Sequence, residues 1–167
     1  MSTTQPREQF LLISAHGANA MELTSVINKA AQESRCAIIS SRLGRHGEFS
    51  ALTAQASGSW DALARLEGLL PTLAKRHELS VNVTRSASAT SRPQALPYVV
   101  YVSAAYRPDI ISELCQFFTD HHLELESLTC DTYLAPHTGT TMLNANITVT
   151  LPAGTQISWL RDQFLDF

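Results

Sequence analysis

Apolar and polar residues follow two alternating spacings along this chain, and the same order of spacings occurs twice. Residues 10–14 and 98–103 are short runs rich in β-branched and aromatic side chains, which indicates strands. Each run is followed by a turn and then by apolar residues at helical spacing. The repeat predicts two copies of one small domain.

The first half predicts a strand–helix–strand–strand–helix–strand order. The elements are expected near residues 10–14, 20–34, 36–43, 48–56, 60–73 and 79–84. Residues 10–14 are apolar on both faces, which is typical of a central strand. Residues 44–47 carry the two glycines of a hairpin turn.

Several single residues should fix the helices of the first half. Asn19 and Ser59 are expected N-caps, and Glu22 is placed almost as in a capping box. Trp60 is expected to anchor the core. Pro71 should kink the second helix or start a new turn, because its ring clashes with the preceding turn.

The second half repeats this plan without its final strand. Strands are expected at 97–104, 124–134 and 143–151, with a hairpin loop at 135–139 and helices after 109 and after Thr155, the expected cap. The two halves predict an α+β fold of two ferredoxin-like βαββαβ domains in tandem, in which strand four pairs beside strand one at the sheet edge. The strand near residue 100 should therefore have an unpaired edge. We expect an incomplete C-terminus, with a tail outside the structure or pairing by another segment as alternatives.

The domain bounds follow from this order. We expect an N-terminal tail at 1–8, a first domain at 9–84, a linker at 85–96 rich in Ser, Ala and Thr, and an incomplete second domain at 97–167. Exposed sheet edges and two small domains favour association, for example as a homodimer.

Composition excludes several classes of function. The chain has 167 residues, 44% hydrophobic and 16% charged, with a formal net charge of -3 and no basic block, which argues against direct nucleic-acid binding. No apolar run approaches the ~20 residues that span a bilayer. Three cysteines without a Cys-x-x-Cys pair and without a signal peptide indicate a reduced, cytoplasmic protein, and each cysteine is expected within a helix or strand.

The catalytic inventory is weak, so no enzyme activity, metal or cofactor is predicted. The six histidines form no metal-ligand spacing. Cys115 lies on an apolar helical stripe and is expected to be buried and structural. An enzyme would need a shared cleft for titratable groups such as Cys115, Asp120 and His121.

The two strand-to-helix turns are the candidate binding sites. Backbone N–H groups at a helix N-terminus attract carboxylates, so an anion or amino acid is the expected ligand. Ordinary capped turns are an equally open alternative. The candidate residues are Gly17, Ala18, Asn19 and Ala20 in the first turn, and Ala105, Tyr106, Arg107, Pro108 and Asp109 in the second.

The doubled plan resembles the tandem ACT proteins, which are small-ligand regulatory modules of amino-acid metabolism. The segments Ser41-Arg-Leu43, Gly47-Glu-Phe49 and Ser57-Gly-Ser-Trp60, with Arg92-Pro93 in the linker, resemble the glycine cleavage system transcriptional repressors. The resemblance implies a non-enzymatic regulator without a DNA-binding domain. It implies contact with a DNA-bound transcriptional activator, modulated by glycine.

The ligand turn of that family commonly has Asp-Arg-Pro-Gly before the helix. In the first turn Asn19 stands at the Asp position and residues 20–22 replace the rest; in the second, Arg107 and Pro108 are kept. Because Arg107 can pair with a carboxylate, we expect the second turn to contribute more to any binding. The alternative function is an amino-acid-binding regulatory subunit of a metabolic enzyme.

Overall fold

The computed structural model describes residues 9–87 and 96–167, and the chain divides into two compact units, Met1–Thr90 and Ser91–Phe167. Unit 1 contains β1 (Gln9–Gly17), α1 (Ala20–Glu33), β2 (Ala37–His46), β3 (Phe49–Ser57), α2 (Trp60–Arg76) and β4 (Ser80–Ala87). Unit 2 contains β5 (Leu96–Ala105), α3 (Ile110–Asp120), β6 (Glu124–Leu134), β7 (Thr141–Leu151) and α4 (Ile157–Asp166). The predicted order of elements, and with it the fold class, is confirmed.

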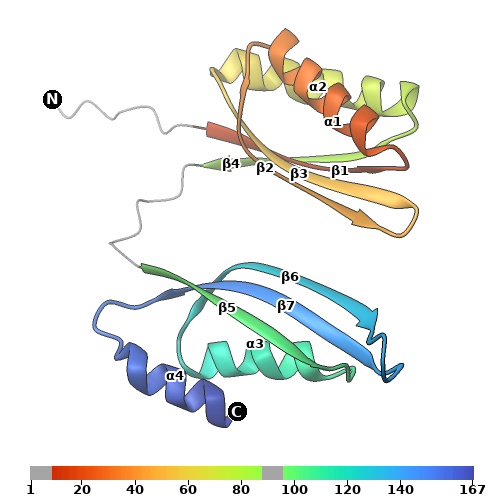
Figure 1. Cartoon of the computed structure of the whole chain (residues 1–167). Coiled ribbons are helices and arrows are strands. Elements are labelled where there is room, and N and C mark those ends of the chain that lie inside the picture. The colour runs from red at the N-terminus through yellow and green to blue at the C-terminus, as the bar shows by residue number, and fades with distance from the viewer. Residues whose placement is uncertain (1–8, 88–95) are drawn as a thin grey trace, which may run out of the picture. The chain divides into compact units, whose positions relative to one another are not determined.

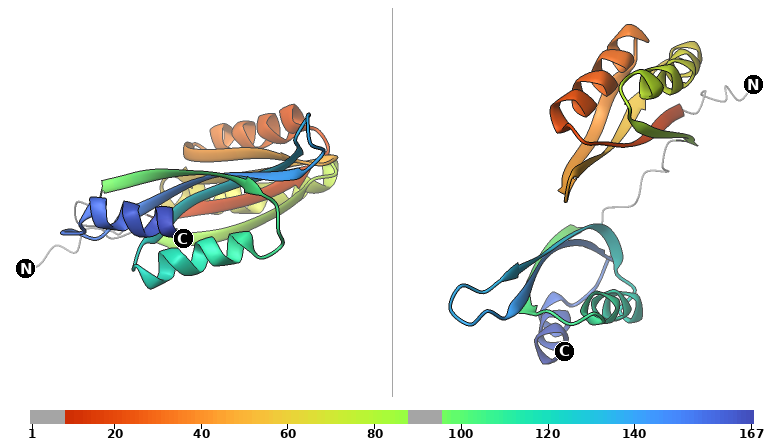
Figure 2. Two further views of the ribbon diagram at one scale, coloured as in Figure 1. Left: turned by 60° about the horizontal axis from the view of Figure 1, so that its bottom comes forward. Right: turned by 90° about the vertical axis from the view of Figure 1, so that its right-hand side faces the viewer.

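Each unit has an antiparallel sheet with its helices on one face (Figure 1). The strand order is β2-β3-β1-β4 in unit 1 and β5-β7-β6 in unit 2. As expected, β1 is central and β4 pairs beside it at the edge, while β5 is an edge strand. Figure 2 shows the two layers of each unit from other sides.

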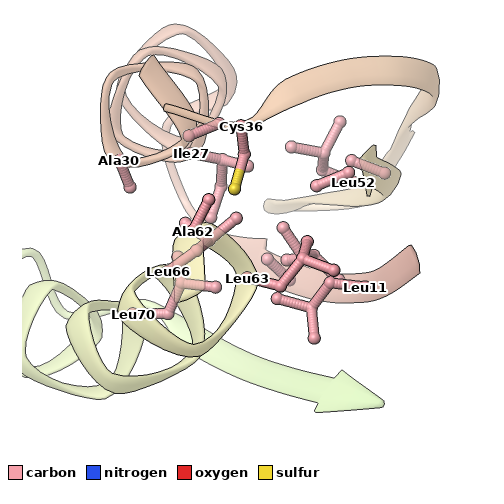
Figure 3. Close-up of a cluster of buried hydrophobic side chains, with 14 of the residues drawn as sticks. Leu11, Ile27, Ala30, Cys36, Leu52, Ala62, Leu63, Leu66 and Leu70 are labelled. Atoms are coloured by element: carbon pink, nitrogen blue, oxygen red, sulfur yellow. The ribbon is translucent and has the colours of Figure 1, made fainter. Parts of the chain in front are cut away.

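The core of unit 1 fills the space between its two helices and its sheet. Figure 3 shows side chains from both helices meeting those of the central strands, among them Leu11, Ile27, Leu63 and Leu66. These four are at most 1% exposed. Full burial of a leucine or isoleucine side chain contributes about 1.5–3 kcal/mol each, so this layer supplies much of the unit's stability.

The first strand is apolar on both faces but buried on only one. Leu11, Ile13 and Ala15 face the helices, whereas Leu12 is 40% exposed on the opposite face. The helices cover a single face of an antiparallel sheet, so alternate residues even of a central strand face away from them. The apolar run therefore predicted the position of β1 correctly but not its full burial.

The core of unit 2 is less complete. Its sheet buries Leu143, Ile147 and Val149 of β7, but α4 has no buried residue. The matching helix of unit 1, α2, buries five: Ala62, Leu63, Leu66, Leu70 and Ala74. A strand corresponding to β4 is absent from the described part of unit 2.

The turn between β2 and β3 is shorter than predicted. Strand β2 continues through Gly44 and Arg45 to His46, and only Gly47 and Glu48 form the turn. Gly47 has φ 62°, which explains the glycine there, since L-residues rarely adopt this conformation. Gly44 needs no such freedom. The prediction of a turn over residues 44–47 was therefore wrong for its first three residues.

Several expected helix features have a different form. Trp60 is 64% exposed rather than a core anchor, and the Arg85 guanidinium lies 5.6 Å from its ring centroid. Pro71 lies within α2 without ending it. Thr155 does not cap α4, whose N-cap is Gln156, because the Thr155 hydroxyl donates to the Pro152 carbonyl at 2.8 Å instead.

The cysteines also differ from expectation. Cys36 is buried but precedes β2 rather than lying in it, Cys115 is only half-buried, and Cys130 is exposed. Of the predicted linker, residues 85–87 belong to β4 and residue 96 to β5. The rest of the linker, with Arg92 and Pro93, lies outside the described residues, as does the predicted tail at 1–8.

Candidate functional site

The first strand-to-helix turn begins at Gly17, which lies close to the side chain of Leu79. A Cβ on Gly17 would lie 2.5 Å from Cδ2 of Leu79, far inside normal contact distance. Gly17 is itself buried at the end of β1. A larger residue at position 17 would therefore require the Leu79 side chain, just before β4, to move, and local sequence spacing does not predict this contact.

Asn19 caps α1 as the sequence predicts. Its Oδ1 accepts hydrogen bonds from the backbone N–H groups of Met21 at 3.0 Å and Glu22 at 3.1 Å. The capping box is not completed, because the Glu22 carboxylate lies 2.8 Å from Nδ1 of His77, the C-cap residue of α2. The N–H groups of Ala18 and Ala20 take part in no hydrogen bond within the described residues.

A hollow of about 560 Å³ opens beside this turn, and we call it the first-turn hollow. One side is the turn itself, and the other is formed by the ends of β2 and β3. Its lining residues are Ala18, Asn19, Ala20, Met21, Leu43, Gly44, Arg45 and Ser50. Three of the four predicted residues of the first turn therefore line one hollow, and Gly17 does not.

Strand pairing brings a cation and a hydroxyl to this hollow. Gly17 is opposite Ser50, and Ser50 is opposite Arg45, so the three form a row across β1, β3 and β2. Paired residues of an antiparallel sheet project to the same face, which here is the face that carries the helices. Within the described residues, Arg45 has no ion pair and the hydroxyl of Ser50, a residue only 3% exposed, has no hydrogen-bond partner.

These groups suit a small carboxylate. A guanidinium is always charged in proteins and offers donors in a fork that matches a carboxylate. The positive end of α1 and two unengaged backbone N–H groups lie on the opposite wall. The hydroxyl of Ser50, which also lines the hollow, is a further hydrogen-bonding group for such a ligand.

In the second turn, Arg107 is already paired with carboxylates of the same chain. Arg107 donates to both carboxylate oxygens of Glu113, the Nη1–Oε1 distance being 3.0 Å, and its Nη1 lies 3.5 Å from Asp109. Asp109 is the N-cap of α3 but makes no side-chain capping bond. A ligand carboxylate would have to compete for Arg107 with the carboxylates of Asp109 and Glu113. The expected dominance of the second turn stays a prediction, and this geometry does not favour it.

The remaining groups considered for chemistry do not form a cluster. Nδ1 of His121 lies 2.8 Å from the Phe117 carbonyl oxygen, and Asp120 accepts a hydrogen bond from Gln116 at 2.7 Å. Over residues 9–87 and 96–167, no three His, Cys, Asp or Glu side chains gather as metal ligands. None of the helices described is both long and apolar enough to cross a membrane.

Sequence analysis missed the residues that β2 and β3 contribute to the first-turn hollow. Arg45 is 26 positions from Asn19, and only the register of two strand pairs brings it back to the turn. One signal was available, because both Arg45 and Ser50 lie within the block from Ser41 to Trp60 that carries the family resemblance. The likeness of that block indicates a family, but the residues within it have no spacing that indicates a site.

Comparison with known proteins shows which proteins this chain is similar to. Residues 9–84 match the ACT domain family. The chain is 26% identical over 161 residues to the glycine cleavage system transcriptional repressor of Escherichia coli (strain K12), covering 96% of this chain and 85% of that protein.

Two solved structures share the fold over nearly the whole chain. One is a crystal structure titled as a putative glycine cleavage system transcriptional repressor, with a TM-score of 0.70, 24% identity, and coverage of 93% of this chain and 88% of that one. The other is an unknown protein from Galdieria sulphuraria, with a TM-score of 0.67, 19% identity, and coverage of 95% and 94%. Both likenesses concern the architecture.

Proposed function

We propose that this chain, a tandem ACT protein similar to the glycine cleavage system transcriptional repressors, is a non-enzymatic regulator of glycine cleavage genes. The observation that carries the proposal is the match to a named repressor along 96% of the chain, rather than over the ACT domain alone. The weak catalytic inventory supports the same conclusion.

Regulation would operate through protein contact in the cytoplasm. A formal net charge of -3 without a basic block does not suit direct contact with DNA phosphates. The regulator would therefore bind a transcriptional activator, as the family resemblance implies. Within the described residues, each unit has two sheet edges and one sheet face without helices, which provide backbone and side-chain surface for such a partner, or for a homodimer.

A small amino acid such as glycine would modulate that contact from the first-turn hollow. Its carboxylate would face Arg45 and the N–H groups of Ala18 and Ala20. The hollow spans α1 on one side and the end of the β2–β3 hairpin on the other. Ligand binding would therefore hold the hairpin against the helix and change the surface that a partner meets.

The direct test is co-purification. The tagged chain is immobilised and incubated with the purified activator of the glycine cleavage genes from the same organism. The experiment is done without glycine and with glycine at about 10 mM, which is high enough to detect weak binding. Retention that changes with glycine supports the proposal. Absence of retention under both conditions would contradict the activator contact.

An amino-acid-binding subunit of a metabolic enzyme is the second candidate. The first-turn hollow favours it as much as the regulator, because both need a competent ligand site. Calorimetric titration with a panel of amino acids measures that site directly. Binding of an amino acid other than glycine, together with failure to retain the activator, would favour the subunit.

A further inference from the structure

The unengaged groups that line the first-turn hollow are mainly hydrogen-bond donors. Arg45 contributes a guanidinium that has no ion pair within the described residues. The start of α1 contributes its positive end and the N–H groups of Ala18 and Ala20, which take part in no hydrogen bond there. Each of these groups favours an anion or an acceptor atom on a ligand.

Carboxylates are absent from the lining of this hollow within the described residues. The two nearest along the chain are directed elsewhere or lie outside it: Glu22 lies 2.8 Å from Nδ1 of His77, and Glu48 is in the hairpin turn. The Oδ1 of Asn19 already accepts two backbone N–H groups. An ammonium group in the hollow would therefore have no anionic partner, and it would lie near the like charge of Arg45.

The hydroxyl of Ser50 lies beside the guanidinium in the row that crosses the sheet. Ser50 is opposite Arg45 on the neighbouring strand, is 3% exposed and lines the hollow, and its hydroxyl has no hydrogen-bond partner within the described residues. Neighbouring strands are about 4.8 Å apart, so one small ligand can reach both side chains. A carboxylate paired with Arg45 would bring the atom next to it toward Ser50, where an O–H can donate to an oxygen.

We propose that the first-turn hollow binds small 2-oxo acids more tightly than amino acids of the same carbon skeleton. The carboxylate accepts from Arg45, and the oxo oxygen accepts from the Ser50 hydroxyl and the N–H groups at the start of α1. An amino acid has at that position an ammonium group, which only donates.

The inference rests on the proposed function, because it names a second class of ligand for the hollow from which an amino acid would modulate the partner contact. A 2-oxo acid would compete with that amino acid for Arg45. The contact with the partner protein would then respond to the ratio of the two ligands rather than to the amino acid alone.

Inorganic phosphate is a less suitable ligand although it could use the same donors. Met21 and Leu43, which are 79% and 50% exposed, also line the hollow and give it an apolar part. The short carbon chain of a 2-oxo acid can contact these side chains, whereas phosphate has no apolar atoms. The volume of about 560 Å³ admits chains longer than that of pyruvate.

Isothermal titration of the full chain with pyruvate, L-alanine and propionate, at constant ionic strength, tests the inference. The three ligands share a carboxylate and a three-carbon chain, and they differ in carrying an oxo oxygen, an ammonium group or neither at the α-carbon. Pyruvate should bind most tightly, with a Kd at least about tenfold below that of alanine. Alanine, propionate or inorganic phosphate binding as tightly as pyruvate would overturn the inference.

Two pairs of variants locate the preference. Met21→Glu places a carboxylate on the helix side of the hollow and should lower the preference for pyruvate over alanine at least about tenfold, whereas Met21→Gln should leave it unchanged. Both should fold, because Met21 is 79% exposed. Arg45→Ala should weaken pyruvate binding at least about tenfold, whereas Arg42→Ala, on the opposite sheet face, should not. Equal effects of the two members of either pair would overturn the inference.

The outcome is separable from that of the proposed function. If glycine changes retention of the activator but pyruvate does not bind more tightly than alanine, the 2-oxo acid preference is refuted and the regulator proposal stands. If pyruvate shows the preference but the activator is not retained, the preference stands and the activator contact is refuted.

Discussion

The first-turn hollow makes a prediction that separates the two candidate ligand turns. Replacing Arg45 by alanine should weaken amino-acid binding much more than replacing Arg107. Arg45 lines the hollow and has no ion pair within the described residues. Arg107, in contrast, already donates to Glu113 and lies 3.5 Å from Asp109.

The expected size follows from these contacts. A hydrogen bond to a charged group contributes about 1.5–3 kcal/mol, so Arg45→Ala should raise Kd roughly 10- to 150-fold. Arg107 must give up its bonds to Glu113 before it can pair with a ligand. The net gain is then small, and Arg107→Ala should change Kd by less than about threefold.

Isothermal titration with glycine, alanine and serine at constant ionic strength measures these values. Arg42→Ala is the matched control, since Arg42 is on the same strand but pairs with Thr53 on the opposite face. Binding that survives Arg45→Ala and disappears in Arg107→Ala would refute the reasoning and restore the second turn. An equal loss in Arg42→Ala would show that only general positive charge matters.

The remaining predictions concern stability and reactivity. Leu66→Ala in unit 1 and Ile147→Ala in unit 2, both 0% exposed, should each lower the free energy of unfolding by about 2–5 kcal/mol in urea titrations; losses below about 1 kcal/mol would contradict the core assignment. Ser34 is 0% exposed and its hydroxyl has no partner within the described residues, so Ser34→Ala should be neutral or stabilising by up to about 1 kcal/mol, with destabilisation as the contrary result. Burial raises the pKa of the Cys36 thiol, and the nearby Arg65 lowers it less, so Cys36 should react with iodoacetamide more slowly than exposed Cys130. Because the folded state holds that proton more tightly, stability should be full below the ordinary thiol pKa and fall as pH rises above it; a Cys36→Ala variant that keeps the same alkaline slope would refute this cause.

Local sequence patterns were sufficient to predict the helices and strands. The helical spacing of Leu63, Leu66 and Leu70 predicted α2, and Asn19 and Ser59 cap their helices as expected. These features depend on residues within one or two turns of each other. The doubled plan also predicted that β5 would be an edge strand, because the strand order of such a sheet follows from the order of its elements.

The sequence predicted the burial and the interaction partners of single side chains less well, because both depend on segments that are distant in the sequence. Trp60 has the large apolar side chain typical of a core residue, but it is exposed, with Arg85 beside its ring. Glu22 has almost capping-box spacing, yet its carboxylate pairs with His77, 55 positions away. In both cases the competing partner lies on another element, and local spacing carries no information about it.

The sequence by itself determined the repeated strand–helix plan and the family resemblance, because period, caps and turn residues act over short distances. Tertiary structure alone decided which turn has an available cation. The pairing of β1 with β3 and of β3 with β2 brings Arg45 to the first turn, while Glu113 occupies Arg107 at the second.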